Sequence, residues 1–111
     1  MLIDLIDIDS LNETLYNTNL VLLDFWAQWC GPCRMLSSIL DEVQTELKDG
    51  VTIVKINVDE SKEIAAEYGI QSLPTLILFK NREKLGAKNG FMSKSSIIQW
   101  IDESLEGKID A

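Results

Sequence analysis

A strand, a helix and a second strand in close succession constrain the fold of this chain more than any other feature. Leu20–Ala27 is a nearly continuous apolar run, which is typical of a strand buried on both faces. From Pro32 to Leu47 apolar residues recur at helical spacing, and the β-branched segment Val51–Val58 follows after Gly50. Because a helical crossover joins parallel strands, this pattern predicts an α/β fold with an at least partly parallel sheet.

Shorter patterns on both sides of this unit predict the remaining elements. A capping box at Ser10 opens one helix, Ser61 and Ser93 cap two others, and Gly107 ends the last. The predicted segments are a strand over Leu2–Ile8, a helix over Ser10–Thr18, a short helix from Ser61 to Gly69, two hairpin strands over Thr75–Phe79 and Lys84–Ala87, and a helix from Ser93 to Gly107.

Length and composition predict that these elements form one domain spanning 1–111. A chain of 111 residues is long enough for one hydrophobic core and too short for two. Apolar residues make up 46% and charged residues 25%, which is ordinary globular usage rather than the composition of a disordered chain. The formal net charge of -8, without any stripe of Lys and Arg, argues against nucleic acid as a partner.

The first residues do not have the composition of an export signal. No positive charge precedes the apolar residues, and Asp4, Asp7 and Asp9 interrupt them. All apolar runs are far shorter than the roughly 20 residues that cross a bilayer. We therefore expect a cytoplasmic protein without membrane contact, in which a close cysteine pair is more often catalytic or metal-binding than structural.

Cys30 and Cys33 lie between the buried strand and the long helix, and three roles compete for them. As a structural cross-link they would close a loop of only four residues, which contributes about 2 kcal/mol. A closed zinc site needs four nitrogen or sulfur ligands, whereas the chain has two Cys and no His. Thiol–disulfide exchange needs only a thiolate and a second thiol nearby, and residues i and i+3 of a helix share one face. Exchange is therefore favoured.

The two cysteines are expected to differ in reactivity. Cys30, at the helix start, lies beside unpaired backbone N–H groups and the positive end of the helix dipole, which favour its thiolate. Cys33, one turn inside the helix, is expected to be more buried and to stay protonated until a base acts. Pro32 suits the first helical turn, and Gly31 lets a docking chain approach the backbone. We therefore expect Cys30 to attack and Cys33 to resolve.

The segment Asp24–Cys33 resembles the active-site segment of the thioredoxin family, whose signature is Trp-Cys-Gly-Pro-Cys. The similarity extends over roughly Leu2 to Leu105 and includes Lys55–Asp59, Tyr68–Ile70, Leu73–Thr75 and Leu78–Asn81. The resemblance implies a thioredoxin fold, with a central mixed sheet of five strands flanked by about four helices. It also implies a dithiol protein that reduces protein disulfides, requires no bound cofactor or metal, and is recycled by a thioredoxin reductase.

Asp24 is an acidic residue inside an apolar strand, where burial of an ionised carboxylate is costly. One interpretation is a carboxylate satisfied by neighbouring hydrogen bonds. The resemblance implies instead an acid that accepts the Cys33 proton through water, with Lys55 on the next strand as its charge partner. For Lys55 itself, an ordinary solvated side chain is the alternative.

The resemblance also implies a groove that binds substrate beside the cysteines. Its expected parts are the exposed ring of Trp29, the segment Leu73, Pro74 and Thr75 with a cis bond before Pro74, and a wall that includes Gly90 and Phe91. The exposed backbone near Pro74 is expected to pair with an extended substrate segment. Trp26 either packs in the core or supports the site, and Trp100, on the periodic face of the last helix, is expected in the core.

The chain departs from the family pattern at five positions. Ser38 replaces a proline that often kinks the long helix. Arg82 replaces a glycine after Asn81, so we expect a looser hairpin loop there than a type I′ turn. Ser72, Asn89 and Phe91 stand where the family more often has glycine, an apolar residue and alanine, which is expected to change substrate choice. Phe91 is expected to narrow the groove or make it more apolar.

Two other functions remain as alternatives. A disulfide oxidase or isomerase of the same fold would need an oxidising compartment and a less stable disulfide. A non-catalytic interaction module would be recruited for its surface alone. The expected partners are the reductase and disulfide-containing client proteins, and the expected state is a monomer.

Overall fold

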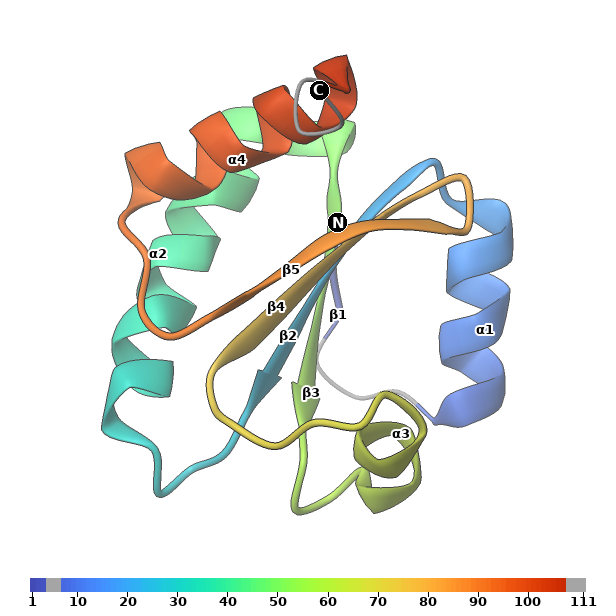
Figure 1. Ribbon diagram of the computed structural model, residues 1–111, viewed down its shortest axis with the longest axis vertical. Coiled ribbons are helices and arrows are strands. Elements are labelled where there is room, and N and C mark those ends of the chain that lie inside the picture. The colour runs from blue at the N-terminus through green and yellow to red at the C-terminus, as the bar shows by residue number, and fades with distance from the viewer. Residues whose placement is uncertain (4–6, 108–111) are drawn as a thin grey trace.

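The computed structural model describes residues 1–3 and 7–107, and in it one sheet lies between two pairs of helices (Figure 1). The elements in chain order are β1 (Leu2–Ile3), α1 (Ile8–Asn17), β2 (Leu20–Trp26), α2 (Gly31–Leu47), a 3-10 turn (Lys48–Gly50), β3 (Thr52–Asn57), α3 (Lys62–Glu67), β4 (Thr75–Lys80), β5 (Glu83–Asn89) and α4 (Lys94–Glu106).

The five strands form a mixed sheet in the order β1-β3-β2-β4-β5. β1 and β2 both pair with β3 in parallel, as the predicted strand–helix–strand unit requires. β4 runs antiparallel to β2, and β5 runs antiparallel to β4. The central mixed sheet and the hairpin are therefore confirmed, and β2 is the central strand.

The central strand explains why helices cover both faces of the sheet. Successive side chains of a strand point to opposite faces. Leu20 and Leu22 pack with α2 and α4, whereas Val21, Leu23 and Phe25 pack with α1 and α3. Figure 1 shows α2 and α4 on one side of the sheet and α1 and α3 on the other. Trp100 of α4 is 6% exposed in the first of these clusters, as expected of a core residue.

The start of the first helix was predicted too late. The Asp7 carboxylate accepts a hydrogen bond of 2.8 Å from the backbone N–H of Ser10, so Asp7 is the N-cap and the helix begins at Ile8. Ser10 therefore lies inside the helix rather than at its cap. Of the first strand predicted over Leu2–Ile8, the structure describes Leu2–Ile3 as strand, and residues 4–6 lie outside the described residues.

The hairpin turn between β4 and β5 is tighter than predicted. Lys80 pairs directly with Glu83, which leaves only Asn81 and Arg82 in the turn, with φ of 50° and 71°. Positive φ at both central residues is the type I′ geometry, so the expectation of a looser loop is wrong. The Arg82 guanidinium lies 4.4 Å from the centroid of the Tyr16 ring. This cation–π contact stabilises the turn by about 0.5–1 kcal/mol and helps to offset the unfavourable backbone of Arg82.

The last helix follows its predicted signals closely. The Ser93 side chain accepts a hydrogen bond from the backbone N–H of Ser96, and Gly107 ends the helix in the left-handed conformation. No described helix is both long enough and apolar enough to span a membrane.

Candidate active site

The cysteine pair lies where β2 passes into α2. Cys30 is the N-cap of α2, and its Sγ accepts a hydrogen bond of 3.3 Å from the backbone N–H of Cys33. The two residues form a disulfide, with their Cα atoms 5.3 Å apart. Gly31 and Pro32 occupy the first helical turn, where a missing N–H leaves no hydrogen bond unmade. The predicted position of Cys30 at a helix N-terminus is confirmed.

The two cysteines differ in burial in the predicted order. Cys30 is 6% exposed and Cys33 is 1% exposed. Together with Ala27 they form a small apolar cluster, against which Trp26, Val58 and Leu73 pack. Trp26 therefore packs against the cysteine cluster from the end of β2. Leu73, from the loop before β4, also contributes an apolar contact to this cluster, although it is distant from the cysteines in sequence.

Trp29 is the most exposed aromatic residue beside the pair. The residue is 70% exposed, and its Nε1 donates a hydrogen bond of 2.9 Å to Oδ2 of Asp59. The backbone N–H of Asp59 in turn donates to Oδ1 of Asn57, at 2.9 Å, in the turn after β3. The expected exposure of Trp29 is confirmed. Asp59 was not predicted as its anchor, because the contact joins residues 30 positions apart.

The segment before β4 reaches the site as the resemblance implied. The Leu73–Pro74 peptide bond is cis. The carbonyl oxygen of Pro74 accepts a hydrogen bond of 2.9 Å from the backbone N–H of Gly90, which brings the end of β5 to the same place. Among the described residues, none forms a hydrogen bond with the backbone N–H or C=O of Leu73. Phe91, next to Gly90, is 46% exposed.

Asp24 is a buried acid within β2. It is 1% exposed, and neither carboxylate oxygen has a hydrogen-bond partner among the described residues. The interpretation of a carboxylate satisfied by neighbouring protein groups is therefore wrong. Burial raises the pKa of Asp24 from 3.8 to about 7, and the positive charge of Lys55 opposes this rise. A carboxyl group with this pKa can take up or release a proton near neutrality.

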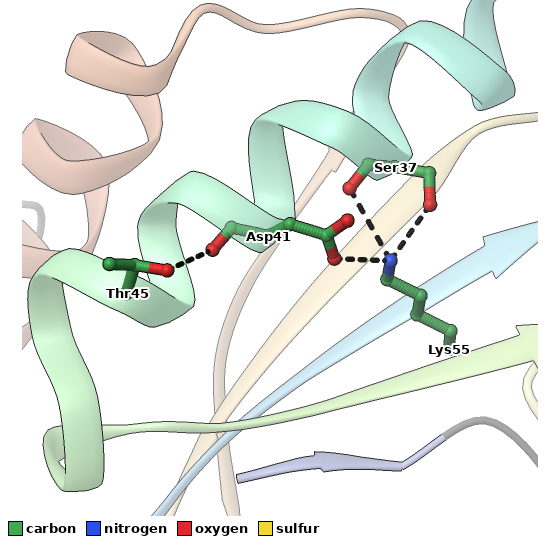
Figure 2. A network of polar contacts seen from close by, with 4 residues as sticks. All are labelled: Ser37, Asp41, Thr45 and Lys55. Atoms are coloured by element: carbon green, nitrogen blue, oxygen red, sulfur yellow. Dashed lines mark hydrogen bonds and ion pairs between the residues drawn. The ribbon is translucent and has the colours of Figure 1, made fainter.

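Lys55 lies opposite Asp24 in the register of β2 and β3, so the two side chains share the α2 face of the sheet. The ammonium group does not bond to Asp24. Nζ contacts the Asp41 carboxylate at 2.8 Å, the Ser37 hydroxyl at 2.7 Å and the Ser37 carbonyl at 3.3 Å (Figure 2). One turn further along α2, Thr45 Oγ1 donates a hydrogen bond of 3.0 Å to the backbone carbonyl of Asp41 (Figure 2).

Of the two interpretations of Lys55 from sequence, the structure contradicts only the solvated side chain. It is 8% exposed, so it is not an ordinary solvated lysine. Its direct charge partner is Asp41, and its charge reaches Asp24 only through space. Ser37 and Asp41 lie at i and i+4 on α2, a spacing so common on helix surfaces that nothing in the sequence singles them out.

A pocket gives access to this buried side of the pair. Its volume is about 560 Å³, and it is lined by Trp26, Cys33, Arg34, Ser37, Ser38, Lys55 and Glu60. In the described part of the chain, no three His, Cys, Asp or Glu side chains gather as metal ligands. The arrangement can therefore exchange sulfur bonds at one side of the pair and protons at the other.

Comparisons with known proteins agree with this chemistry. The family model for thioredoxin matches residues 5–103. The chain is 46% identical over 99 residues to a thioredoxin of Rickettsia typhi, which covers 89% of this chain and 94% of the relative. It is 50% identical over 93 residues to a thioredoxin of Rickettsia felis (84% of this chain and 89% of the relative).

The fold is also similar to a solved structure. A mutant thioredoxin from Halobacterium salinarum superposes with a TM-score of 0.83 at 30% identity, covering 93% of this chain and 89% of that one. Sequence, fold and the paired cysteines at the start of α2 agree: the chain belongs to the thioredoxin family of thiol–disulfide oxidoreductases.

Proposed function

We propose that this chain reduces disulfides in client proteins, with Cys30 attacking and Cys33 resolving. The Cys30 thiolate attacks one sulfur of the client disulfide, forms a mixed disulfide and releases the other client sulfur as a thiolate. Cys33 then loses its proton and attacks the Cys30 sulfur. The Cys30–Cys33 disulfide forms, the second client sulfur leaves, and the client has gained two electrons. The position of Cys30 as N-cap, more exposed than Cys33, carries this assignment.

Asp24 is the proposed acceptor of the Cys33 proton, and Lys55 is the proposed modulator of its pKa. The pKa of about 7 supports this role, because the carboxylate and the acid are both populated at neutral pH. Lys55 shares the α2 face with Asp24 and lines the pocket beside Cys33. Asp24 does not line that pocket and has no hydrogen bond to Cys33 among the described residues, so the proton would pass between the two groups through water.

The proposed client groove lies on the Cys30 side. Trp29 offers an exposed ring, and Gly31 and Pro32 leave the start of α2 open to a docking chain. Leu73 presents backbone groups that form no hydrogen bond with the residues the structure describes, between the cysteine cluster and the Pro74–Gly90 contact. An extended client segment can pair with this backbone, with Thr75, Gly90 and Phe91 at its flank.

We also propose the wider setting implied by the family. In this setting a thioredoxin reductase restores the dithiol, disulfide-containing proteins are the clients, and no cofactor is bound, as membership of the thioredoxin family implies. A cytoplasmic location agrees with the reducing direction of the proposed reaction. The net charge of -8 agrees with a protein that does not bind nucleic acid. A monomer without membrane contact completes the proposed setting.

Reduction of insulin disulfides by the reduced protein, compared with the Cys30→Ser variant, tests the proposal. Turbidity should develop with the first protein and not with the second. The equilibrium with glutathione separates a reductase from an oxidase, since a strongly oxidising couple would contradict the reducing direction. If a variant with both cysteines replaced by Ser kept its full effect in cells, the chain would act as an interaction module instead.

A further inference from the structure

Three side chains near the proposed groove bind one another across two distant segments. Asn89 Nδ2 donates hydrogen bonds to Ser72 Oγ at 2.7 Å and to Thr75 Oγ1 at 2.9 Å. Thr75 Oγ1 donates to the backbone oxygen of Ser72 at 2.6 Å. These contacts join the end of β5 to the loop that enters β4. We call Ser72, Thr75 and Asn89 the Ser72–Asn89 clamp.

The donors and acceptors allow one arrangement of the clamp. Because the Thr75 hydroxyl gives its only proton to the Ser72 carbonyl, its oxygen faces Asn89 as an acceptor. The amide nitrogen of Asn89 must therefore point toward it, and the second amide hydrogen goes to Ser72 Oγ. Asn89 is thus the residue on which both inter-segment contacts depend.

The clamp encloses the backbone that a client would meet. Ser72 precedes Leu73, and Thr75 follows Pro74, so the clamp holds both ends of this dipeptide. The hydrogen bond from Gly90 to the Pro74 carbonyl adds a third attachment from the same side. Leu73, whose backbone forms no hydrogen bond among the described residues, is therefore held between anchored neighbours.

We propose that the Ser72–Asn89 clamp positions the Leu73 backbone for extended protein clients and so contributes to client selection. This inference rests on the proposed function, in which a client segment pairs with Leu73. A preset backbone lowers the conformational cost of binding, so the clamp acts on client affinity rather than on the sulfur chemistry. Glycine and apolar residues, which the family more often has at positions 72 and 89, cannot form these side-chain bonds.

Two substrates separate positioning from chemistry. Insulin offers extended chain segments, whereas dithionitrobenzoate is a small aromatic disulfide with no backbone to pair. For Asn89→Val we expect KM for insulin to rise about fivefold, as the loss of one exposed and one partly buried hydrogen bond implies, with kcat little changed. The rate with dithionitrobenzoate should stay within about twofold of the parent protein. Valine suits an exposed strand position, and thermal unfolding checks that the fold is kept.

A double variant and a control sharpen the test. Ser72→Ala removes one of the two Asn89 contacts and should raise KM less than Asn89→Val does. The double variant should match Asn89→Val alone, because that change already breaks both contacts. Lys88→Gln, on the neighbouring position of β5 and outside the clamp, should leave both substrates unchanged.

The clamp proposal is overturned if Asn89→Val leaves KM for insulin unchanged, or if both substrates slow by the same factor. Additive effects of Ser72→Ala and Asn89→Val would also overturn it, because the two changes would then act independently. Failure of the parent protein to reduce dithionitrobenzoate faster than Cys30→Ser would instead overturn the proposed function, and the clamp proposal with it.

Discussion

The two sides of the cysteine pair are built in opposite ways. On the Cys33 side, the pocket is lined by Lys55, which is held by Ser37 and Asp41 and is paired in strand register with Asp24, a carboxyl group without hydrogen-bond partners in the described chain. On the Cys30 side, Trp29 is 70% exposed and Leu73 offers a backbone that is unpaired within the described chain. One side is buried and charged, and the other is open and largely apolar. The difference teaches that proton transfer and client docking can be changed separately.

Replacing each cysteine separately by serine should give the largest effects. Cys30→Ser removes the attacking sulfur, so reduction of insulin should fall on the order of 1000-fold. Cys33→Ser keeps the attack and removes the resolving sulfur, so a stable mixed disulfide with the client should accumulate. Non-reducing electrophoresis and mass spectrometry distinguish the outcomes. A client trapped on Cys33 of the Cys30→Ser variant would reverse the assigned roles.

Asp24→Asn should change both stability and its dependence on pH. The folded pKa of about 7 lies above the unfolded value of 3.8, so the folded state holds the proton more tightly. The stability that this proton provides is fully present below pH 3.8 and is lost as the pH rises through about 7. Asn has no such loss, so the variant should gain up to about 4 kcal/mol in free energy of unfolding at pH 8, and little at pH 4.

Urea unfolding at both pH values measures this gain, and Asp102→Asn, at an exposed carboxylate of α4 outside the Lys55 network, is the matched control. The same variant should lose the rise in the resolving rate near pH 7 that an ionising base produces. An equal stability gain at pH 4 and pH 8 would show that Asp24 does not titrate as proposed.

Lys55→Met tests the charge on the buried side. Without the ammonium group, the pKa of Asp24 should rise above 7 by about one pH unit, because only the effect of burial remains. Carboxyl carbon NMR of labelled Asp reads this directly. Lys62→Met, a change at an exposed lysine of α3, serves as the control. An unchanged Asp24 titration in Lys55→Met would mean that the lysine is purely structural.

Phe91→Ala should give the smallest effect, and only on the open side. Phe91 is 46% exposed, so its truncation should cost less than about 1 kcal/mol of stability. If Phe91 forms a wall of the groove, KM for insulin should change about twofold to threefold, while the pKa of Asp24 stays as it is. Steady-state kinetics with insulin and with the reductase measure this. If both sets of constants are unchanged, Phe91 has no part in docking.

Much of the fold followed from local patterns in the sequence. The buried run at β2, the amphipathic period of α2 and the β-branched run at β3 each identify their element, and the crossover between them fixes parallel pairing. The cysteine spacing and the start of α2 likewise placed Cys30 as the N-cap. Where two local signals competed, sequence reasoning failed: Asp7 rather than Ser10 caps α1, and Asn81 with Arg82 forms a tight turn without glycine.

The sequence by itself determined the α/β architecture, the exchange chemistry of Cys30 and Cys33, and the buried acid at Asp24, because periodicity and short spacings act between near neighbours. Only the tertiary structure decided that Lys55 bonds to Asp41, that Trp29 is anchored by Asp59 and that Asn89 clamps Ser72. Each of these contacts joins residues 14 to 30 positions apart. Which polar groups meet over such separations depends on how the strands and helices pack, and that packing leaves no local pattern in the chain.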